Sequence, residues 1–259
     1  MSEKVFADAI NEAIAEEMRR DQNVFIMGED IRLSVYGATA NLFNEFGEER
    51  VLDTPLSENG FFGAAIGASL VGMRPIVETV TSFMWVAMDQ LISQAAKMRY
   101  MFGGQATLPV VYRASMMYGS GSAAHHSDRP YPMFMNMPGI KIAVPANPSD
   151  AKALLKTAVR DDDPVIIFED ANLYGTRGEV VEEEIPFGKA QIVKEGSDCT
   201  IVGIAGSVNL SITAANELEK EGISVEVINP RTLVPLDKSA ILNSVEKTCL
   251  LYTSDAADE

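Results

Sequence analysis

Two adjacent histidines, His125 and His126, are the only histidines in the chain. They lie in residues 116–136, a stretch rich in Gly, Ser, Pro and Met between two expected strands. A long loop after the carboxyl end of a parallel strand is where α/β proteins place their sites. A pair of surface histidines without chemical function is the alternative. No third ligand at a suitable spacing accompanies them, so the sequence does not support a zinc site here.

A carboxylate in residues 53–61 is a second candidate. An expected strand ends at Asp53 and an expected helix begins near Glu58. Glu58 either takes part in chemistry or simply complements the positive end of the helix dipole. Small residues recur three and four positions apart between Gly60 and Ala68. They allow the close approach of a ligand ring, although ordinary tight helix packing explains them equally well.

Three carboxylates, Asp161 to Asp163, directly follow an expected helix over residues 149–160. Negative charges at a helix C-terminus oppose the dipole and repel one another. Helix-end carbonyls and carboxylates together form an all-oxygen set that suits a hard cation, so a cation site is one interpretation. A solvated acidic turn before Pro164 is the other.

Composition excludes several classes of protein. The chain carries 37 Asp and Glu against 21 Lys and Arg, for a formal net charge of -16, and it has no basic stripe, which disfavours nucleic-acid binding. We expect a cytoplasmic protein without membrane contact, because no segment approaches the roughly 18 apolar residues of a membrane span and no secretory signal is recognisable. Cys199 and Cys249 are isolated and are expected to be buried thiols in a reducing compartment.

Alternating apolar runs and helical patterns predict the scaffold that positions these residues. Strands are expected at residues 24–27, 50–53, 75–79, 109–113, 141–144 and 164–168, and helices at 1–22, 60–72, 82–102 and 149–160. Near-continuous apolar strands between helices indicate an α/β fold whose parallel sheet is covered by helices on both faces. The first helix is expected to begin at once, with Ser2 as its cap.

A second, smaller unit is expected after residues 171–184, which interrupt this rhythm, end in the acidic stretch 179–184 and are predicted to be solvated. Expected strands at 187–193, 200–205, 224–229 and 249–252 alternate with helices at 208–221 and 237–245. The prediction is a complete α/β domain over 1–175, a linker over 176–186 and a partial second α/β domain over 187–251. Residues 252–259 are expected to be a non-native-looking tail of a C-terminally truncated chain.

Several stretches together resemble the beta subunit of the first component of 2-oxo acid dehydrogenase complexes, a family that includes pyruvate, branched-chain 2-oxo acid and acetoin enzymes. They occur in family order and spacing from residue 3 to residue 251: Asp53 to Phe61, Asp89-Gln90 with Ala95 to Lys97, Ala124 to Ser127, Met137 to Lys141, Asn229 to Thr232 and Pro235 to Asp237. The resemblance implies a thiamine diphosphate pyrimidine-binding domain of the transketolase type, followed by a transketolase C-terminal-like domain. It also implies oxidative decarboxylation of a 2-oxo acid, with pyruvate as the favoured substrate, and transfer of the acyl group to a lipoyl group.

The resemblance further implies an active site shared with an alpha subunit in an alpha2-beta2 heterotetramer, which works with a dihydrolipoyl acyltransferase. The alpha subunit of the family holds the pyrophosphate and Mg²⁺ of thiamine diphosphate through a Gly-Asp-Gly…Asn motif that this chain lacks. Glu58 matches the glutamate that hydrogen-bonds the aminopyrimidine ring, where a shared proton favours the reactive imino form. His126 matches the family's active-site histidine, and Leu56 and Met84 match residues that line the pyrimidine pocket.

A structural potassium site is also implied by the resemblance. Its ligands would be Asp161 and Asp163 with the carbonyls of Val110, Ala158 and Val159. A bound cation would offset the unfavourable interaction between these carboxylates and the negative end of the helix dipole.

Two departures from the family leave the acyl substrate open. His125 stands where many relatives carry Gln, and residues 128–132 replace a Ser/Gln-rich aromatic stretch. Arg99, Arg113 and Arg129 are each candidates to approach a substrate carboxylate. A sugar-phosphate enzyme half of the transketolase type and a non-catalytic α/β binding subunit are the competing hypotheses.

Overall fold

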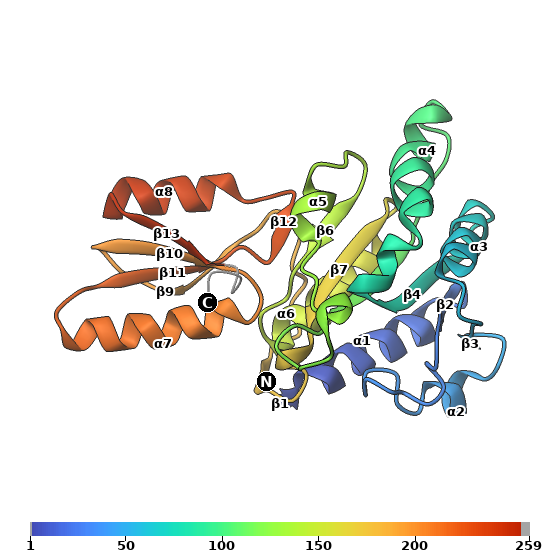
Figure 1. Cartoon of the computed structure of the whole chain (residues 1–259), viewed down its shortest axis with the longest axis horizontal. Helices are drawn as coiled ribbons and strands as arrows, with labels where there is room; N and C mark the ends of the chain where they lie inside the picture. The colour runs from blue at the N-terminus through green and yellow to red at the C-terminus, as the bar shows by residue number, and fades with distance from the viewer. Residues whose placement is uncertain (1, 255–259) are drawn as a thin grey trace.

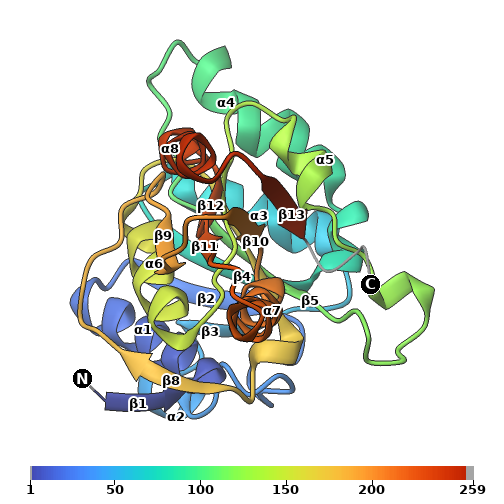
Figure 2. The ribbon, with the colours of Figure 1, turned by 90° about the vertical axis from the view of Figure 1, so that its left-hand side faces the viewer.

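The computed structural model describes residues 2–254, which form two α/β units, each built on one main sheet, with a separate two-stranded sheet beside the larger one (Figures 1 and 2). The larger sheet has seven strands in the order β12-β6-β7-β5-β4-β2-β3. Its strands are β2 (Val24–Gly28), β3 (Val51–Asp53), β4 (Arg74–Val80), β5 (Val111–Met116), β6 (Lys141–Ala143), β7 (Val165–Asp170) and β12 (Thr232–Val234). All neighbours are parallel except β12, which runs antiparallel to β6. The predicted α/β class is therefore confirmed.

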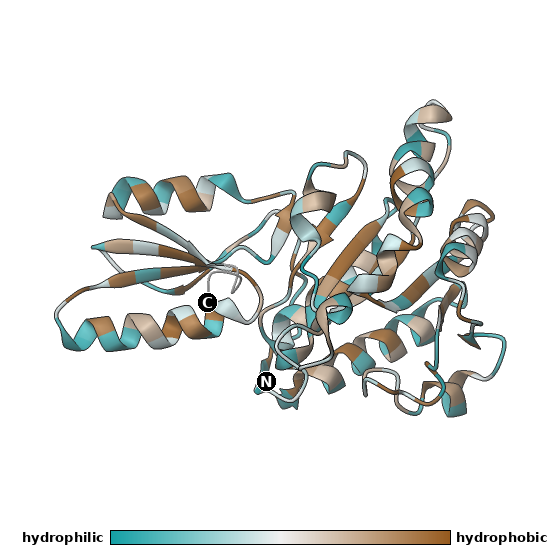
Figure 3. Ribbon diagram, in the orientation of Figure 1, coloured by the Kyte–Doolittle hydropathy of each residue, from teal (hydrophilic) through white to brown (hydrophobic). Residues whose placement is uncertain are grey.

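Helices cover both faces of this sheet. One face carries α1 (Phe6–Arg20), α2 (Leu42–Phe46) and α6 (Pro148–Arg160), and the other carries α3 (Glu58–Leu70), α4 (Ala96–Met101) and α5 (Tyr131–Met135). Successive side chains of a strand point to opposite faces of the sheet. Val24 therefore packs into the core beneath α1, α2 and α6, and Phe25 packs into the core beneath α3, α4 and α5. Both faces need apolar residues, which explains the continuous apolar runs and the hydrophobic colouring of the central strands in Figure 3.

The predicted N-terminal helix is wrong over its first turn. Residues Ser2–Val5 form strand β1, which pairs antiparallel with β8 (Arg177–Val180), and α1 begins at Phe6 without a side-chain cap from Ser2. The same pairing places residues 177–180 of the expected solvated stretch in a strand, whereas residues 181–184 are exposed as expected. Glu182 in that stretch also forms an ion pair with Lys152, which is only 3% exposed on α6.

The long helix predicted over residues 82–102 is not continuous. A 3-10 turn occupies Thr81–Trp85, a π-helical segment occupies Asp89–Ala95, and only then does α4 begin. The wider π turn changes the register of the chain, and both Leu91 and Ala95 remain buried in the core beneath α3. Periodicity alone cannot distinguish such a segment from an ordinary helix.

The smaller sheet has the order β13-β10-β11-β9. Its elements are β9 (Gln191–Lys194), β10 (Cys199–Gly203), α7 (Ser207–Lys220), β11 (Val225–Asn229), α8 (Lys238–Thr248) and β13 (Leu251–Ser254). Residues 252–254 of the predicted tail thus belong to a strand, and residues 255–259 lie outside the described range. Cys199 is half-buried and Cys249 is exposed, so the expectation of two buried thiols is wrong. No helix within residues 2–254 is long and apolar enough to cross a membrane.

A buried carboxylate joins the two units. Asp150, fully buried near the start of α6, accepts hydrogen bonds from Asn229 Nδ2 at 2.7 Å and from Arg231 Nε at 2.8 Å. The chain then returns to the larger sheet as β12, which the sequence did not predict. The stretch Asn229 to Thr232 therefore serves to connect the units.

Gly139 lies where a loop passes very close to the helical layer. Its φ is +103°, and a Cβ there would lie 1.9 Å from the carbonyl oxygen of Ala96. Gly104 has a φ of +83° with no atom within 4 Å of such a Cβ. An alanine at Gly104 would therefore have only the strained backbone conformation, whereas an alanine at Gly139 would have both this strain and a steric clash.

We expect Gly139→Ala to lower the free energy of unfolding by about 3 kcal/mol or more, because strain and overpacking add. Gly104→Ala, with strain alone, is expected to cost about 1 kcal/mol. Urea unfolding of both variants measures the difference. Equal losses of unfolding free energy in the two variants would contradict a close approach of Gly139 to the Ala96 carbonyl.

Candidate functional site

The candidate site lies where neighbouring parallel strands end. Glu29 directly follows β2, and Glu58 begins α3 just after β3. The backbone of Ser57 stabilises the charged form of Glu29 and lowers its pKa, so the carboxylate lies beside the first turn of α3. Because β2 and β3 are adjacent and parallel, their carboxyl ends bring the two glutamates to one edge of the sheet.

Glu29 is electrostatically unusual. Burial raises its pKa to about 6, and the negative charges of Glu58 and then Asp30 add to this effect. A carboxyl with this pKa can hold or release a proton near neutral pH. The sequence alone did not indicate Glu29, because its raised pKa comes from burial in the fold and then from Glu58, which lies 29 positions away. Its place directly after a buried strand was the only available signal.

Three polar side-chain atoms at this edge are buried and have no hydrogen-bond partner within the described part of the chain. They are Glu29 Oε1, Thr54 Oγ1 and Ser82 Oγ, which follow β2, β3 and β4 respectively. An unsatisfied buried polar atom costs about 1–3 kcal/mol, so such a cluster favours an edge that binds a polar ligand. The cavity beside Glu29 has a volume of only about 70 Å³, space for two or three waters. This chain therefore forms one wall of a site and does not enclose it.

His126 reaches the same edge from the loop after β5. It lies in a short turn, Ala124–His126, and Phe83 meets its ring edge-on with 5.4 Å between the ring centroids. Phe83 also lines the cavity that contains Glu29. The His126 Nδ1 lies 2.9 Å from the carbonyl oxygen of Ser122. A carbonyl can only accept, so Nδ1 carries a proton, and in the neutral ring Nε2 is then the acceptor nitrogen.

The other residues predicted for this site differ in exposure. Leu56 is 84% exposed, whereas Met84 is fully buried in the hydrophobic core on the α3 side of the sheet. Trp85 Nε1 donates a hydrogen bond to the Asp128 carboxylate at 2.8 Å. This bond holds the loop that carries the histidines against the 3-10 turn Thr81–Trp85. His125 lies against His126, with 4.1 Å between ring centroids.

Arg113 is not available to a substrate. It is 1% exposed, and its guanidinium donates to Glu78 at 2.5 Å and to both oxygens of Glu169 at 2.7 and 2.8 Å. Arg99 forms an ion pair with Asp163, and the Arg129 guanidinium lies 3.4 Å from the centroid of the Tyr118 ring. All three arginines are therefore already engaged by other groups of this chain.

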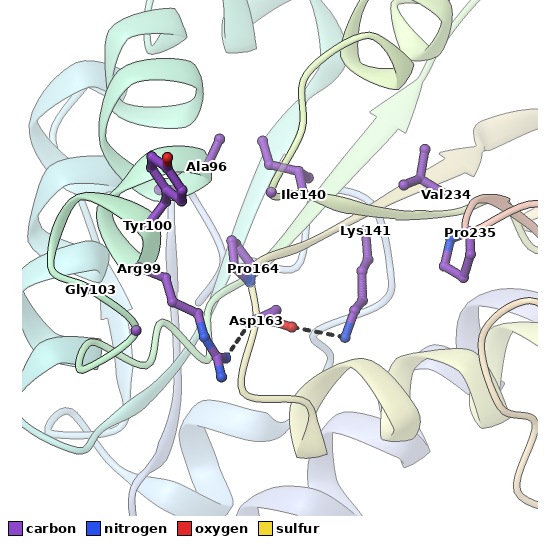
Figure 4. Close-up of a pocket in the computed structure, with 13 residues that line it drawn as sticks. Ala96, Arg99, Tyr100, Gly103, Ile140, Lys141, Asp163, Pro164, Val234 and Pro235 are labelled. Atoms are coloured by element: carbon purple, nitrogen blue, oxygen red, sulfur yellow. Dashed lines mark hydrogen bonds and ion pairs between the residues drawn. The ribbon is translucent and has the colours of Figure 1, made fainter.

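The residues predicted to hold potassium lie together at the opposite edge of the sheet. Lys141 Nζ lies 2.7 Å from Asp161 and 3.2 Å from Asp163, and Figure 4 shows the contact with Asp163. Arg74 donates to the carbonyl of Val159 at 2.9 Å. Backbone N–H groups donate to the carbonyls of Ala158 and Val110, at 3.2 and 3.0 Å. Carboxylate and carbonyl oxygens suit a cation. The side chains of Lys141 and Arg74 already supply positive charge at this corner.

A larger cavity, of about 760 Å³, adjoins this corner and is lined by apolar groups together with Arg99, Lys141 and Asp163 (Figure 4). It lies at the amino ends of β6 and β7. Open α/β sheets bind ligands at the carboxyl ends of their strands. Geometry therefore favours the edge of Glu29, Glu58 and His126, despite its smaller cavity.

Family profiles identify the class of protein. The profile described as "Transketolase, pyrimidine binding domain" matches residues 3–176, and "Transketolase, C-terminal domain" matches residues 188–258. The chain is therefore a transketolase-type α/β protein. It belongs to the beta-subunit family of the first components of 2-oxo acid and acetoin dehydrogenases, as the following relatives show.

Three relatives are each 45% identical to the chain. They are the acetoin:2,6-dichlorophenolindophenol oxidoreductase subunit beta of Bacillus subtilis (97% of this chain, 79% of the relative), the 2-oxoisovalerate dehydrogenase subunit beta of the same species (100% and 81%) and the pyruvate dehydrogenase E1 component subunit beta of Rickettsia felis (93% and 76%). The resemblance inferred from the sequence is confirmed.

Solved structures share the fold. A split-gene transketolase, an inactive beta4 tetramer, superposes with a TM-score of 0.81 at 25% identity, over 96% of this chain and 78% of that chain. The transketolase of Campylobacter jejuni superposes with a TM-score of 0.80 at 18% identity, over 100% and 40%. These likenesses concern the fold alone.

The raised pKa of Glu29 predicts a pH dependence of stability. Folding raises this pKa from 4.5 to about 6, so the folded chain loses stability as pH rises through this window. We expect Glu29→Gln, which cannot ionise, to gain stability relative to the wild type between pH 4.5 and 6, with a constant difference above that range. Urea unfolding across this range measures it.

Glu48→Gln, at an exposed position, is the matched control and is expected to show no such change. If the free energy of unfolding changed with pH in the same way for the wild type and Glu29→Gln, the raised pKa of Glu29 in the folded chain would be contradicted.

Proposed function

We propose that this chain is the beta subunit of a thiamine-diphosphate-dependent 2-oxo acid dehydrogenase. Together with an alpha subunit it would decarboxylate a 2-oxo acid, pyruvate in the first instance, and transfer the acyl group to a lipoyl group. The observation that carries the proposal is the pair Glu29 and Glu58 on an open edge with unsatisfied buried polar atoms. The relatives described above support the same conclusion.

Glu58 and the unpaired polar atoms beside it fit the polar rim of an aminopyrimidine ring, and Leu56 offers an exposed apolar surface to its face. Met84 supports this wall from within the core. When bound, thiamine diphosphate supplies a nucleophilic carbon and an electron sink. Glu58 would share a proton with the ring nitrogen, and the neighbouring Glu29 carboxyl, with its pKa raised to about 6, can hold or release a proton near neutral pH beside it.

His126 orients the acyl substrate or the lipoyl group. With its Nδ1 proton directed to the Ser122 carbonyl, its Nε2 can accept a hydrogen bond from a hydroxyl or thiol. The edge-on contact with Phe83 fixes the plane of the ring. This arrangement suits hydrogen bonding and proton transfer during acyl transfer.

The open wall implies partners. The alpha subunit supplies the pyrophosphate and Mg²⁺ half of the site in an alpha2-beta2 heterotetramer, and a dihydrolipoyl acyltransferase receives the acyl group. A cytoplasmic location accompanies this proposal. Acetoin and branched-chain 2-oxo acids are alternative substrates, because relatives named for acetoin and 2-oxoisovalerate are as similar as those named for pyruvate. A substrate panel on the reconstituted complex distinguishes them.

The test of the catalytic assignment is co-expression with a cognate alpha subunit and an assay of 2-oxo acid decarboxylation. We expect Glu58→Gln to lower kcat by about 100-fold or more, in the range of general acid–base catalysis, because an amide cannot hold the exchangeable proton. Glu48→Gln is the control, with unchanged activity. Full activity of Glu58→Gln would refute the assigned role.

A potassium ion at the corner of Asp161 and Asp163 is part of the proposal, with the carbonyls of Val110, Ala158 and Val159 as further ligands. Its support is that both carboxylates approach one cationic group, Lys141 Nζ at 2.7 and 3.2 Å, whose place the ion would take. We expect the melting temperature of the chain to be higher in potassium chloride than in an equal concentration of tetramethylammonium chloride. Asp163→Asn is expected to reduce this difference. An identical melting temperature in both salts would count against the site.

A further inference from the structure

The loop that carries His126 is closed at its base by two of its own residues. Tyr118 precedes the histidine and Arg129 follows it, and the guanidinium of Arg129 lies over the Tyr118 ring at 3.4 Å from the centroid. A cation held this close to an aromatic face is attracted to it. The position of Tyr118 therefore sets the position of both ends of the loop.

Tyr118 is in turn held by the end of β7. Its hydroxyl donates to Asp170 Oδ2, and its backbone carbonyl accepts from Asn172 Nδ2 at 3.2 Å. Burial and the neighbouring Asp170 carboxylate raise the pKa of Tyr118, so the hydroxyl keeps its proton at physiological pH. The hydrogen bond is thus present throughout the range in which an enzyme of this kind works.

Asp170 also binds the second unit. Its carboxylate is fully buried and accepts the backbone N–H of Gly206, just before α7, at 3.1 Å. Its other oxygen accepts the backbone N–H of Asn172 at 3.0 Å. One carboxylate therefore connects the histidine loop, the end of a central strand and the second unit.

We infer that Tyr118, Arg129, Asp170 and Gly206 form a positioning latch that couples the placement of the second unit to the position of His126. This role rests on the proposed function of His126, and none of the four residues touches the reacting atoms. A cavity of about 410 Å³ borders all four of them. Once the latch is released, the loop has room to move into this space.

Hydrogen exchange of the full chain tests the latch without any assay of activity. Tyr118→Phe removes the hydroxyl and keeps the ring for Arg129. We expect amides in residues 117–127 to exchange about tenfold faster, as after the loss of a hydrogen bond to a charged group. Tyr100→Phe makes the same change at a side chain that is 90% exposed, and it is expected to leave these amides unchanged.

Gly206→Ala tests the coupling from the second unit. A Cβ at this position would lie 2.4 Å from Asp170 Oδ2, so the substitution displaces the carboxylate. We expect the same acceleration in residues 117–127, although the substitution lies about 80 positions away in the sequence. Gly175→Ala, where a Cβ meets no atom within 4 Å, is the matched control. Wild-type exchange rates in both Tyr118→Phe and Gly206→Ala would overturn the latch.

Kinetics of the reconstituted complex test the positioning role. We expect Tyr118→Phe to lower kcat about tenfold and to leave KM for the 2-oxo acid within about twofold, because a misplaced His126 affects the reacting step more than binding. Faster exchange with unchanged kcat would refute the positioning role. A wild-type complex without decarboxylase activity would refute the proposed function, while the exchange experiment would still decide on the latch itself.

Discussion

The buried guanidinium of Arg113 is the charge on which the larger sheet depends. It lies on β5 between Glu78 of β4 and Glu169 of β7, and Tyr174 donates a further hydrogen bond to Glu169. A buried charge without a partner costs several kcal/mol, so these three strands are held in the one register that pairs all three groups. That register places the carboxyl ends of β4 and β5 side by side, and with them the segments that carry Phe83 and His126.

Buried aspartates serve the same purpose between the units. Asp150 at the start of α6 binds Asn229 and Arg231, and Asp170 at the end of β7 binds Gly206. Each carboxylate is fully buried, so each would destabilise the chain if its partner moved away. Two such contacts at separate points resist rotation of one unit against the other. These polar pairs therefore help to specify the orientation of the second unit.

Periodicity and apolar runs predicted the central strands and most helices, because burial on both faces leaves a strong signal in the sequence. They missed β1, β8 and β12, which have three or four residues each and pair with distant segments. Residue types and the family resemblance located Glu58 and His126. They could not reveal Glu29, whose pKa is raised by burial in the fold and then by Glu58 at the start of α3. Nor could they show that Lys141 lies on the carboxylates of the predicted potassium site.

The strand β12 has a consequence for how the chain unfolds. It belongs in sequence to the second unit, yet it completes the edge of the larger sheet beside β6. Opening the second unit by itself would pull this strand away and expose the edge of β6. Unfolding of either unit therefore weakens the other, and the two sheets should melt in a single cooperative transition, unlike two domains joined by a flexible linker.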